Sequence, residues 1–250
     1  MKAEEVYNES ASQWERKKPT ILTDFSVRPL IFEWCDNLTG KSVLDLGCGE
    51  GYVSRYCKSH GASRVLGVDI SEGMYLKALT QEQEEPLGID YRHASITEIA
   101  FENSTFDIAL GVFVFNYLTI EQTKTIFTHI FQWLKPKGQF IFSLPHPLWP
   151  FLSKPIPPTY FDPAQQGYFS GRDKTFLGKI WRLDGSILDI QLFHKTFSDI
   201  FECLHAAGFQ SVPECRELPV PKEFMKEAPD LCVQGDDLPL HLVLKIEKQG

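Results

Sequence analysis

The chain of 250 residues lacks the signals of several common protein classes. Its six cysteines form no C-x-x-C pair and no finger-like spacing with histidine, so neither a disulfide scaffold nor structural zinc is indicated. No apolar run has the length of a membrane span, and the polar N-terminus has no signal-peptide core. These absences predict a cytoplasmic protein with free thiols and no attachment to a membrane.

Positive charge is also scarce. The 25 Lys and Arg residues are outnumbered by 33 Asp and Glu residues, which gives a net charge of −8. Proteins that bind nucleic acid through its phosphate backbone usually carry a basic face. The composition therefore argues against nucleic acid as the main partner, and the hydrophobic content of 43% is ordinary for a globular domain.

A glycine-rich stretch after a short buried strand is the most informative feature of the sequence. The run 42–46 is apolar and β-branched, and glycines follow at 47, 49 and 51. Residues 52–59 predict a helix, so the N–H groups of the loop and of the helix N-terminus point toward a ligand. A second predicted strand, 64–68, ends at Asp69, whose carboxylate can accept both hydroxyls of a ribose. The segment predicts a nucleoside site.

The spacing of the glycines distinguishes between nucleoside cofactors. A dinucleotide fingerprint would need its third glycine at position 52, which is Tyr52, and a P-loop would need a Lys-Ser or Lys-Thr pair that is absent. Asp45 precedes the glycines, where its charge would repel a pyrophosphate but suits a ligand with an amino group. The pattern D-x-G-x-G-x-G, from Asp45 to Gly51, resembles the first motif of class I S-adenosylmethionine-dependent methyltransferases.

This resemblance covers about residues 40–145 and implies an α/β fold. We expect a Rossmann-like, mostly parallel seven-stranded sheet with helices on both faces, because predicted strands and helices alternate along the chain. The expectation is one methyltransferase domain in four parts: an N-terminal helical cap over 1–41, a cofactor-binding core over 42–144, a lid over 145–185, and the C-terminal part of the sheet over 186–250.

The resemblance also implies contacts to S-adenosylmethionine at the carboxyl ends of predicted strands. Ile70 and Met74 would flank the adenine, while Ala94-Ser95 stands where relatives carry an acid-plus-alanine pair, so a hydroxyl or backbone group would take that contact. The full expected set of cofactor residues is Tyr7, Trp14, Asp45, Gly47, Cys48, Gly49, Gly51, Asp69, Ile70, Met74, Ala94, Ser95, Ile96, Gly111, Val112 and Phe113.

The N-terminal residues of this set leave two interpretations open. Tyr7, Ala11 and Trp14 match the spacing of a segment that folds over the cofactor in small-molecule methyltransferases. The same spacing also suits an amphipathic helix that packs on the edge of the sheet.

The segment 145–185 differs from the rest of the chain in composition. Seven prolines lie between Pro145 and Pro163, together with many large aromatic residues. Disordered segments use few aromatics, so we expect an ordered lid over a pocket or, alternatively, a flap that only caps the core. The aromatics favour an apolar or cationic small molecule beneath the lid. The expected acceptor-binding residues are Tyr117, His146, Trp149, Tyr160, Tyr168, Phe169 and Trp181.

The chemistry of methyl transfer places few demands on the protein. A methyl sulfonium is already electrophilic, so the enzyme mainly aligns the acceptor in line with the S–CH3 bond and excludes water. A general base is needed only when the acceptor arrives protonated. His146, which follows the predicted strand 139–144, is the candidate base, with a turn histidine bonded to backbone as the alternative. No acidic cluster follows the later strands, so no metal is expected.

The sequence therefore predicts transfer of a methyl group to an O, N or C atom of a small molecule. A tRNA or protein methyltransferase and a non-catalytic cofactor-binding module are the alternatives. A dehydrogenase is disfavoured by the misplaced third glycine. The oligomeric state does not follow from the sequence.

Overall fold

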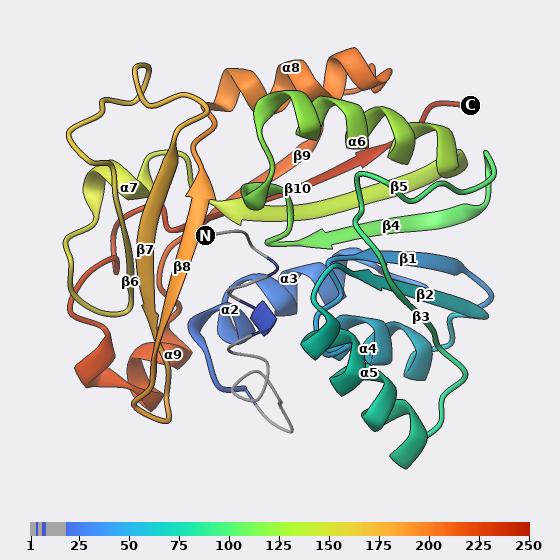
Figure 1. Cartoon of the computed structure of the whole chain (residues 1–250), viewed down its shortest axis with the longest axis horizontal. Coiled ribbons are helices and arrows are strands. Elements are labelled where there is room, and N and C mark those ends of the chain that lie inside the picture. The colour runs from blue at the N-terminus through green and yellow to red at the C-terminus, as the bar shows by residue number, and fades with distance from the viewer. Residues whose placement is uncertain (1–3, 5–6, 9–18) are drawn as a thin grey trace.

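Two β-sheets organise the structure, a computed structural model that describes Glu4, Tyr7, Asn8 and residues 19–250. In this described part, seven strands form a main sheet with the order β3-β2-β1-β4-β5-β10-β9, and three form a small sheet with the order β6-β7-β8 (Figure 1). Trp14 and Ala11 of the predicted N-terminal segment lie outside the described residues.

The main sheet is parallel over five strands and antiparallel over two. Pairing is parallel from β3 through β2, β1 and β4 to β5, whereas β10 runs antiparallel to both β5 and β9. This arrangement confirms the predicted Rossmann-like fold class. The strands are β1 (Ser42–Leu46), β2 (Arg64–Asp69), β3 (Asp90–His93), β4 (Phe106–Val112), β5 (Leu134–Pro145), β9 (Glu214–Leu218) and β10 (His241–Glu247).

Helices cover both faces of the main sheet, because side chains alternate between the faces along each strand. On β1, Leu44 and Leu46 join the apolar cluster of α6 and α8, whereas Val43 joins the cluster of α3, α4 and α5. Both clusters are buried, so the sheet is a rigid platform for the loops at its edge. The helices are α3 (Val27–Trp34), α4 (Tyr52–Ser59), α5 (Glu72–Glu84), α6 (Ile120–Trp133) and α8 (Phe197–Ala207).

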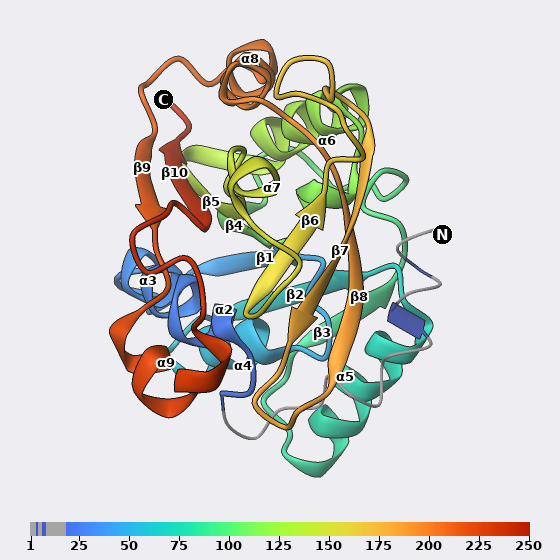
Figure 2. The same cartoon turned by 90° about the vertical axis from the view of Figure 1, so that its left-hand side faces the viewer.

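The small sheet stands across the carboxyl ends of the parallel strands (Figures 1 and 2). Its strands are β6 (Thr159–Asp162), β7 (Thr175–Trp181) and β8 (Ile187–Phe193), all antiparallel. A third apolar cluster, which includes Leu22, Trp149, Phe161 and Phe224, packs it against the rest of the molecule. Shorter elements complete the described chain: α2 (Leu22–Phe25), η2 (Phe115–Tyr117), α7 (Trp149–Leu152), α9 (Lys222–Glu227) and η3 (Pro229–Leu231).

The expected division at residue 185 differs from the sheets that form. The first strand after it, β8, pairs with β7 and not with the main sheet, so the small sheet extends past the expected lid boundary. The rest of 186–250 contributes β9 and β10 to the main sheet, as expected for its C-terminal part. The alternation of apolar residues identifies a strand but does not identify its partner.

Candidate active site

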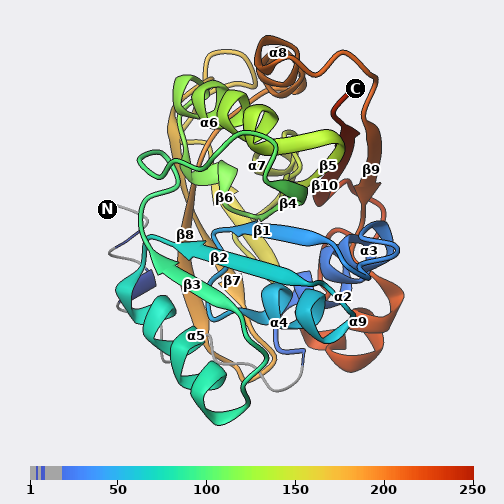
Figure 3. The same cartoon turned by 90° about the vertical axis from the view of Figure 1, so that its right-hand side faces the viewer.

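A cavity of about 780 Å³ lies where the main sheet meets the small sheet. Its volume falls in the range of about 300–1,000 Å³ that is usual for small-molecule sites. One end, the carboxylate half, is lined by Asp45, Asp69 and the loop 47–50. The other end, the small-sheet half, is lined by side chains of β6, β7 and β8 with Trp149 and His241. Figure 3 views the molecule from the side of β1, β2 and β3, whose carboxyl ends border the carboxylate half.

The glycines of the loop after β1 serve different purposes. A Cβ on Gly47 would lie 2.6 Å from a Val114 methyl, and one on Gly51 would lie 2.2 Å from the Tyr91 hydroxyl, so packing requires both glycines. Gly49 has a φ of 58° and no heavy atom within 4 Å of its Cβ position. The backbone at Gly49 is therefore open to a ligand, as a close approach of ligand to chain requires.

Asp69 connects this loop to the end of β2. One carboxylate oxygen accepts the Gly49 N–H at 2.8 Å, and the other accepts the Ser71 N–H at 2.8 Å. Burial raises the pKa of the Asp69 carboxyl, while these two backbone hydrogen bonds lower it. Each carboxylate oxygen has a second acceptor position. Asp69 is thus fixed in orientation and able to accept the paired hydroxyls of a ribose.

Asp45 is a buried carboxylate at the floor of the carboxylate half. Its Oδ2 accepts the Ser54 hydroxyl of α4 at 2.6 Å, and only 1% of the residue is exposed. Burial raises the pKa of Asp45 to about 6, against the opposing effect of the Ser54 hydrogen bond. At neutral pH the group is ionised in a poorly solvated position, so a cationic ligand group nearby would be favourable.

Arg28 is a lining residue that sequence reasoning did not find. It lies in α3, and its Nη1 donates to the Thr23 hydroxyl at 2.6 Å and to Asp24 Oδ1 at 2.7 Å. Among the described residues that line the cavity, no other Lys or Arg occurs. No local motif marks it, because its position over the cavity depends on how α3 packs.

Two tyrosines that lie 110 positions apart in the sequence meet in the lining of the cavity. The hydroxyls of Tyr7 and Tyr117 are 2.7 Å apart, and burial raises both of their pKa values, so both stay neutral. The neighbouring Asn8 accepts the Ser71 hydroxyl at 2.7 Å and the Gly73 N–H at 3.1 Å. The described N-terminal residues are therefore tied across the carboxylate half.

Most of the predicted site residues line this one cavity. They are Tyr7, Asp45, Gly47, Cys48, Gly49, Asp69, Ile70, Met74, Ser95, Ile96, Val112, Phe113, Tyr117 and Trp149. Lining residues that were not predicted include Arg28, Thr97, Asn116, Phe161, Ile180, Ile190 and His241. Asn116 lies in η2, the short helix that follows the carboxyl end of β4, and this position after a strand of the sheet is the signal that could have identified it.

The remaining predicted residues are not among those that line the cavity. Gly51 and Gly111 are needed for packing, since a Cβ on Gly111 would lie 2.2 Å from the Phe115 ring. Ala94 packs against the α6 side of the sheet. The lid residues Tyr160, Tyr168, Phe169 and Trp181 are also absent from the lining.

His146 does not reach the cavity either. Its Nε2 bonds to Glu217 Oε1 at 2.7 Å, and its Nδ1 accepts the Leu148 N–H at 3.2 Å. Both ring nitrogens are thus occupied, and burial lowers the pKa of the imidazole in spite of Glu217. His146 holds α7 and β9 together, which fits the structural alternative and not the role of general base.

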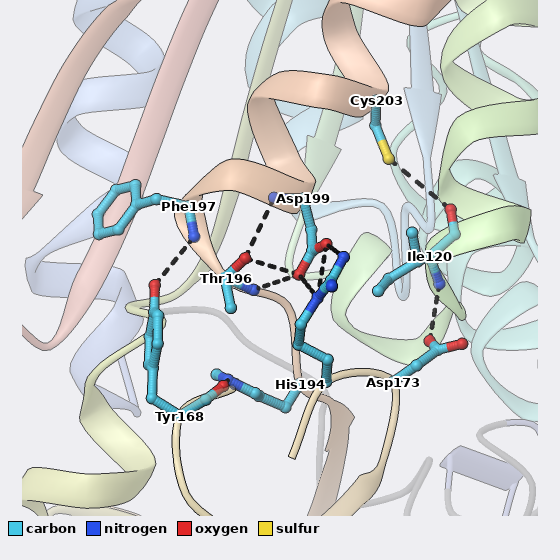
Figure 4. A network of polar contacts seen from close by, with 9 residues as sticks. Ile120, Tyr168, Asp173, His194, Thr196, Phe197, Asp199 and Cys203 are labelled. Atoms are coloured by element: carbon cyan, nitrogen blue, oxygen red, sulfur yellow. Dashed lines mark hydrogen bonds and ion pairs between the residues drawn. The ribbon is translucent and has the colours of Figure 1, made fainter. Parts of the chain in front are cut away.

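Tyr168 belongs to a polar network that fastens the loop before β7 to the helices (Figure 4). Its hydroxyl accepts the Phe197 N–H at 3.0 Å, and its carbonyl is bonded by His194 Nε2 at 2.9 Å. Close by, Arg172 Nε donates to Asp199 at 3.0 Å, and Asp173 accepts the Ile120 N–H at 2.8 Å. This network therefore anchors the loop before β7 to α6 and α8, and Tyr168 is not among the residues that line the cavity.

The donor set of the carboxylate half fits an adenosyl group joined to an amino acid. Asp69 suits a ribose, ionised Asp45 suits an ammonium group, and the open backbone at Gly49 leaves room for the ligand between them. The family described as "Methyltransferase domain" matches residues 43–138, which span this half. Residues 43–138 of the chain are thus similar to a methyltransferase domain.

Known proteins similar to this chain include named methyltransferases. The ubiquinone biosynthesis O-methyltransferase of Pseudomonas fluorescens is 28% identical over 137 residues, which are 53% of this chain and 58% of the relative. The chain spans a little over half the length of the curated relatives it matches.

Solved structures resemble the chain over most of its length. An S-adenosylmethionine-dependent methyltransferase from Mesorhizobium loti has a TM-score of 0.66 and 24% identity, with 88% of this chain and 96% of that chain covered. A protein of Listeria monocytogenes, named as a candidate S-adenosylmethionine-dependent methyltransferase, has a TM-score of 0.62 and 26% identity, with 88% and 100% covered.

The described part of the chain has neither a cluster of metal ligands nor a helix that could span a membrane. No group of three or more His, Cys, Asp or Glu side chains there could hold a metal ion. No helix there combines the length and apolar character needed to cross a bilayer. A cytoplasmic location and independence from metal stay predictions, the second to be tested by activity in the presence of a chelator.

Proposed function

We propose that the protein transfers the methyl group of S-adenosylmethionine to a small molecule held in the small-sheet half. The observation that carries this proposal is that one cavity contains both halves. A ligand bound by Asp45 and Asp69 would therefore meet a second compound without crossing the protein surface.

Charged residues of the carboxylate half would each bind a different polar group of the cofactor. Asp69 would accept the ribose hydroxyls, and Asp45 would face the ammonium group of the methionine moiety. Arg28 would pair with the carboxylate of the methionine moiety. It lines the same cavity and lies close enough to Asp45 to lower the pKa of that carboxyl. A zwitterionic amino acid thus meets one fixed charge of each sign.

Apolar and hydroxyl side chains would enclose the adenine. Met74 is buried and Ile70 is partly exposed, and both line the carboxylate half. Ser95 and Thr97 line it as well, and their hydroxyls are 2.8 Å apart. This pair takes the place of the acid that relatives carry, so the adenine amino group would meet hydroxyls or backbone.

S-Adenosylmethionine supplies an electrophilic methyl group, and the chain supplies alignment and exclusion of water. The small sheet covers the acceptor with Phe161, Ile180 and Ile190, and the Tyr7–Tyr117 contact closes the opposite side. In-line displacement needs no covalent intermediate with the protein.

Enclosure also favours a small acceptor over a macromolecule. A tRNA or a folded protein could reach the methyl group only if the small sheet moved away, and the net charge of −8 offers RNA little attraction. A gel shift with bulk tRNA tests this point, and retarded RNA would contradict it.

Calorimetric titration with S-adenosylmethionine and S-adenosylhomocysteine tests the cofactor assignment. We expect micromolar binding of both, and a loss of about 10- to 100-fold in Asp69→Asn, since that change weakens hydrogen bonds to a charged acceptor. The matched control is Asp189→Asn, which alters an exposed carboxylate on β8 that pairs only with Lys179 among the described residues.

Each calorimetric result has a different consequence for the proposed function. Binding that Asp69→Asn weakens and Asp189→Asn leaves unchanged would support the proposal and justify a search for methyl acceptors in metabolite extracts. No binding of either compound would refute it. Binding without turnover on any extract would favour the non-catalytic module.

A further inference from the structure

The small-sheet half of the cavity carries no charge of its own. The lining residues from its strands are Thr159, Phe161, Thr175, Leu177, Ile180, Ile190, Gln191 and Phe193. None of these described residues is ionisable, while Asp45 and Asp69 lie in the other half. An anionic acceptor would find no countercharge on the small sheet, so the walls favour a neutral, largely apolar compound.

Asn116 places an unsatisfied acceptor in this space. The residue is 5% exposed and lines the cavity, and its Oδ1 is buried without a hydrogen-bond partner among the described residues. Lys195 holds this part of the chain in place, because its Nζ donates to the carbonyls of Phe115 and Leu118. A buried carbonyl oxygen that is rigidly held and unpaired is costly unless a ligand donates to it.

Trp149 also lines the cavity and carries an unsatisfied donor. Its side chain is fully buried, and its Nε1 has no partner among the described residues. A hydroxyl group both donates and accepts a hydrogen bond, whereas a purely apolar ligand would satisfy neither Asn116 nor Trp149.

His241 adds a second acceptor whose tautomer is set by its neighbours. The Ser26 hydroxyl donates to the Leu22 carbonyl at 3.2 Å, so its oxygen accepts from His241 Nδ1 at 2.9 Å. The proton is thus on Nδ1, and Nε2 carries the lone pair. No described group bonds to Nε2, and the ring packs edge-on against Phe113 in the lining.

We propose that the methyl acceptor is a neutral, largely apolar compound with a hydroxyl group, which donates its hydrogen bond to His241 Nε2. Asn116 and Trp149 then bind the remaining polar edge of this compound. During transfer the acceptor oxygen bonds to the methyl carbon, the S–C bond breaks with its electron pair left on sulfur, and the hydroxyl proton passes to Nε2. The resulting imidazolium releases that proton to water with the product. This inference rests on the proposed function.

The electrostatics of His241 suit an oxygen acceptor. Burial, with Arg28 and His146 as lesser causes, lowers the pKa of His241 to about 3. So weak a base removes a proton from a methylated hydroxyl, which is a strong acid, but not from a methylated amine, which stays protonated. The same low pKa keeps the imidazole neutral and ready to accept a hydrogen bond at physiological pH.

The test compares three compounds that share one ring system. The protein saturated with S-adenosylhomocysteine is titrated in a calorimeter with 2-naphthol, 2-methylnaphthalene and 2-naphthyl phosphate. We expect 2-naphthol to bind about 10- to 100-fold more tightly than the methyl compound, and the phosphate not to bind. Methyl transfer from labelled S-adenosylmethionine to 2-naphthol is the second readout.

Variants locate the preference within the cavity. His241→Phe keeps the ring and removes the acceptor, so the preference for naphthol should fall below about threefold while S-adenosylhomocysteine still binds, which also reports an intact fold. The matched control is His205→Gln, which removes an exposed imidazole on α8 outside the cavity and should preserve the preference.

The results distinguish this inference from the proposed function. Failure of S-adenosylhomocysteine to bind wild-type protein would refute the proposed function itself. Binding of S-adenosylhomocysteine with tight binding of the phosphate, with no preference for naphthol, or with a preference that survives His241→Phe, would overturn only the acceptor assignment.

Discussion

The two halves of the cavity are built in different ways. The carboxylate half comes from residues close in sequence, and its side chains are held by backbone groups, as when Asp69 accepts the N–H groups of Gly49 and Ser71. The small-sheet half collects side chains from β6, β7, β8 and the start of β10. A site for a constant cofactor can thus be fixed by the backbone, while a site for a particular acceptor is set by side chains.

The halves also differ in what they contribute to stability. Apolar side chains of the small sheet are buried in contact with Trp149 and Leu22, which stabilises the fold. Asp45 does the opposite, since an ionised carboxylate in a dry position costs free energy until a cation approaches. In the carboxylate half, Asp45 thus lowers the stability of the free protein and favours the binding of a cationic group.

Two glycines of one loop should separate stability from binding. Gly51→Ala forces a Cβ against Tyr91 at a φ of 90° and should lower the free energy of unfolding by about 3 kcal/mol. Gly49→Ala meets no atom and should cost about 1 kcal/mol, yet its methyl group occupies the ligand's space. Chemical denaturation measures the first quantity and calorimetry with S-adenosylmethionine the second. Equal stability losses with unchanged binding in Gly49→Ala would contradict the contrast.

Asp45→Asn should stabilise the free protein and weaken cofactor binding. The pKa of Asp45 is raised from 3.8 to about 6, and a shift of about two pKa units corresponds to about 3 kcal/mol. Because the folded-state pKa lies above the unfolded one, this cost is fully present above about pH 6 and disappears as the pH falls toward 4. Asparagine still accepts the Ser54 hydroxyl, so the loss of charge is the main change.

Measurements at two pH values check the Asp45 prediction. The unfolding free energies of wild type and Asp45→Asn should differ at pH 7.5 and converge near pH 4, and the wild-type affinity for S-adenosylmethionine should decline below pH 6. A variant that is less stable at pH 7.5, or one that binds the cofactor normally, would show that Asp45 is not held as an uncompensated charge.

Lys195→Met should affect the small-sheet half alone. The ammonium group donates to the carbonyls of Phe115, Leu118 and Phe193, which joins η2 to the end of β8. Burial lowers the pKa of Lys195 to about 8, so removal of the charge offsets part of the lost hydrogen bonding, and we expect a net loss of about 1 kcal/mol. Binding of 2-naphthol should weaken severalfold while S-adenosylmethionine binds as before. Weaker cofactor binding would argue against separate halves.

Local sequence determined the glycine loop and the two aspartates of the carboxylate half, although not Arg28. A short apolar run that ends at glycine predicts a buried strand followed by a turn. The strand β1 and the helix α4 lie where this pattern predicts them, at Ser42–Leu46 and Tyr52–Ser59. Parallel strands place their carboxyl ends at one edge, so Asp45 and Asp69 had to meet there once the strands paired. The fold class and the binding loop follow from such short-range rules.

Tertiary structure alone decided the small-sheet half. The strand pattern of Ile187–Phe193 does not specify whether it pairs with β7 or with the main sheet, and the pairing chosen makes a separate cover. The choice between two histidines depended on packing in the same way. Both residues are histidines with the same side chain, but their ring nitrogens have different partners. His146 is bonded at both nitrogens, by Glu217 and by the Leu148 N–H, whereas His241 is bonded only at Nδ1 among the described residues and lines the cavity. Contacts between residues 71 to 215 positions apart made that difference, and no periodicity along the chain encodes them.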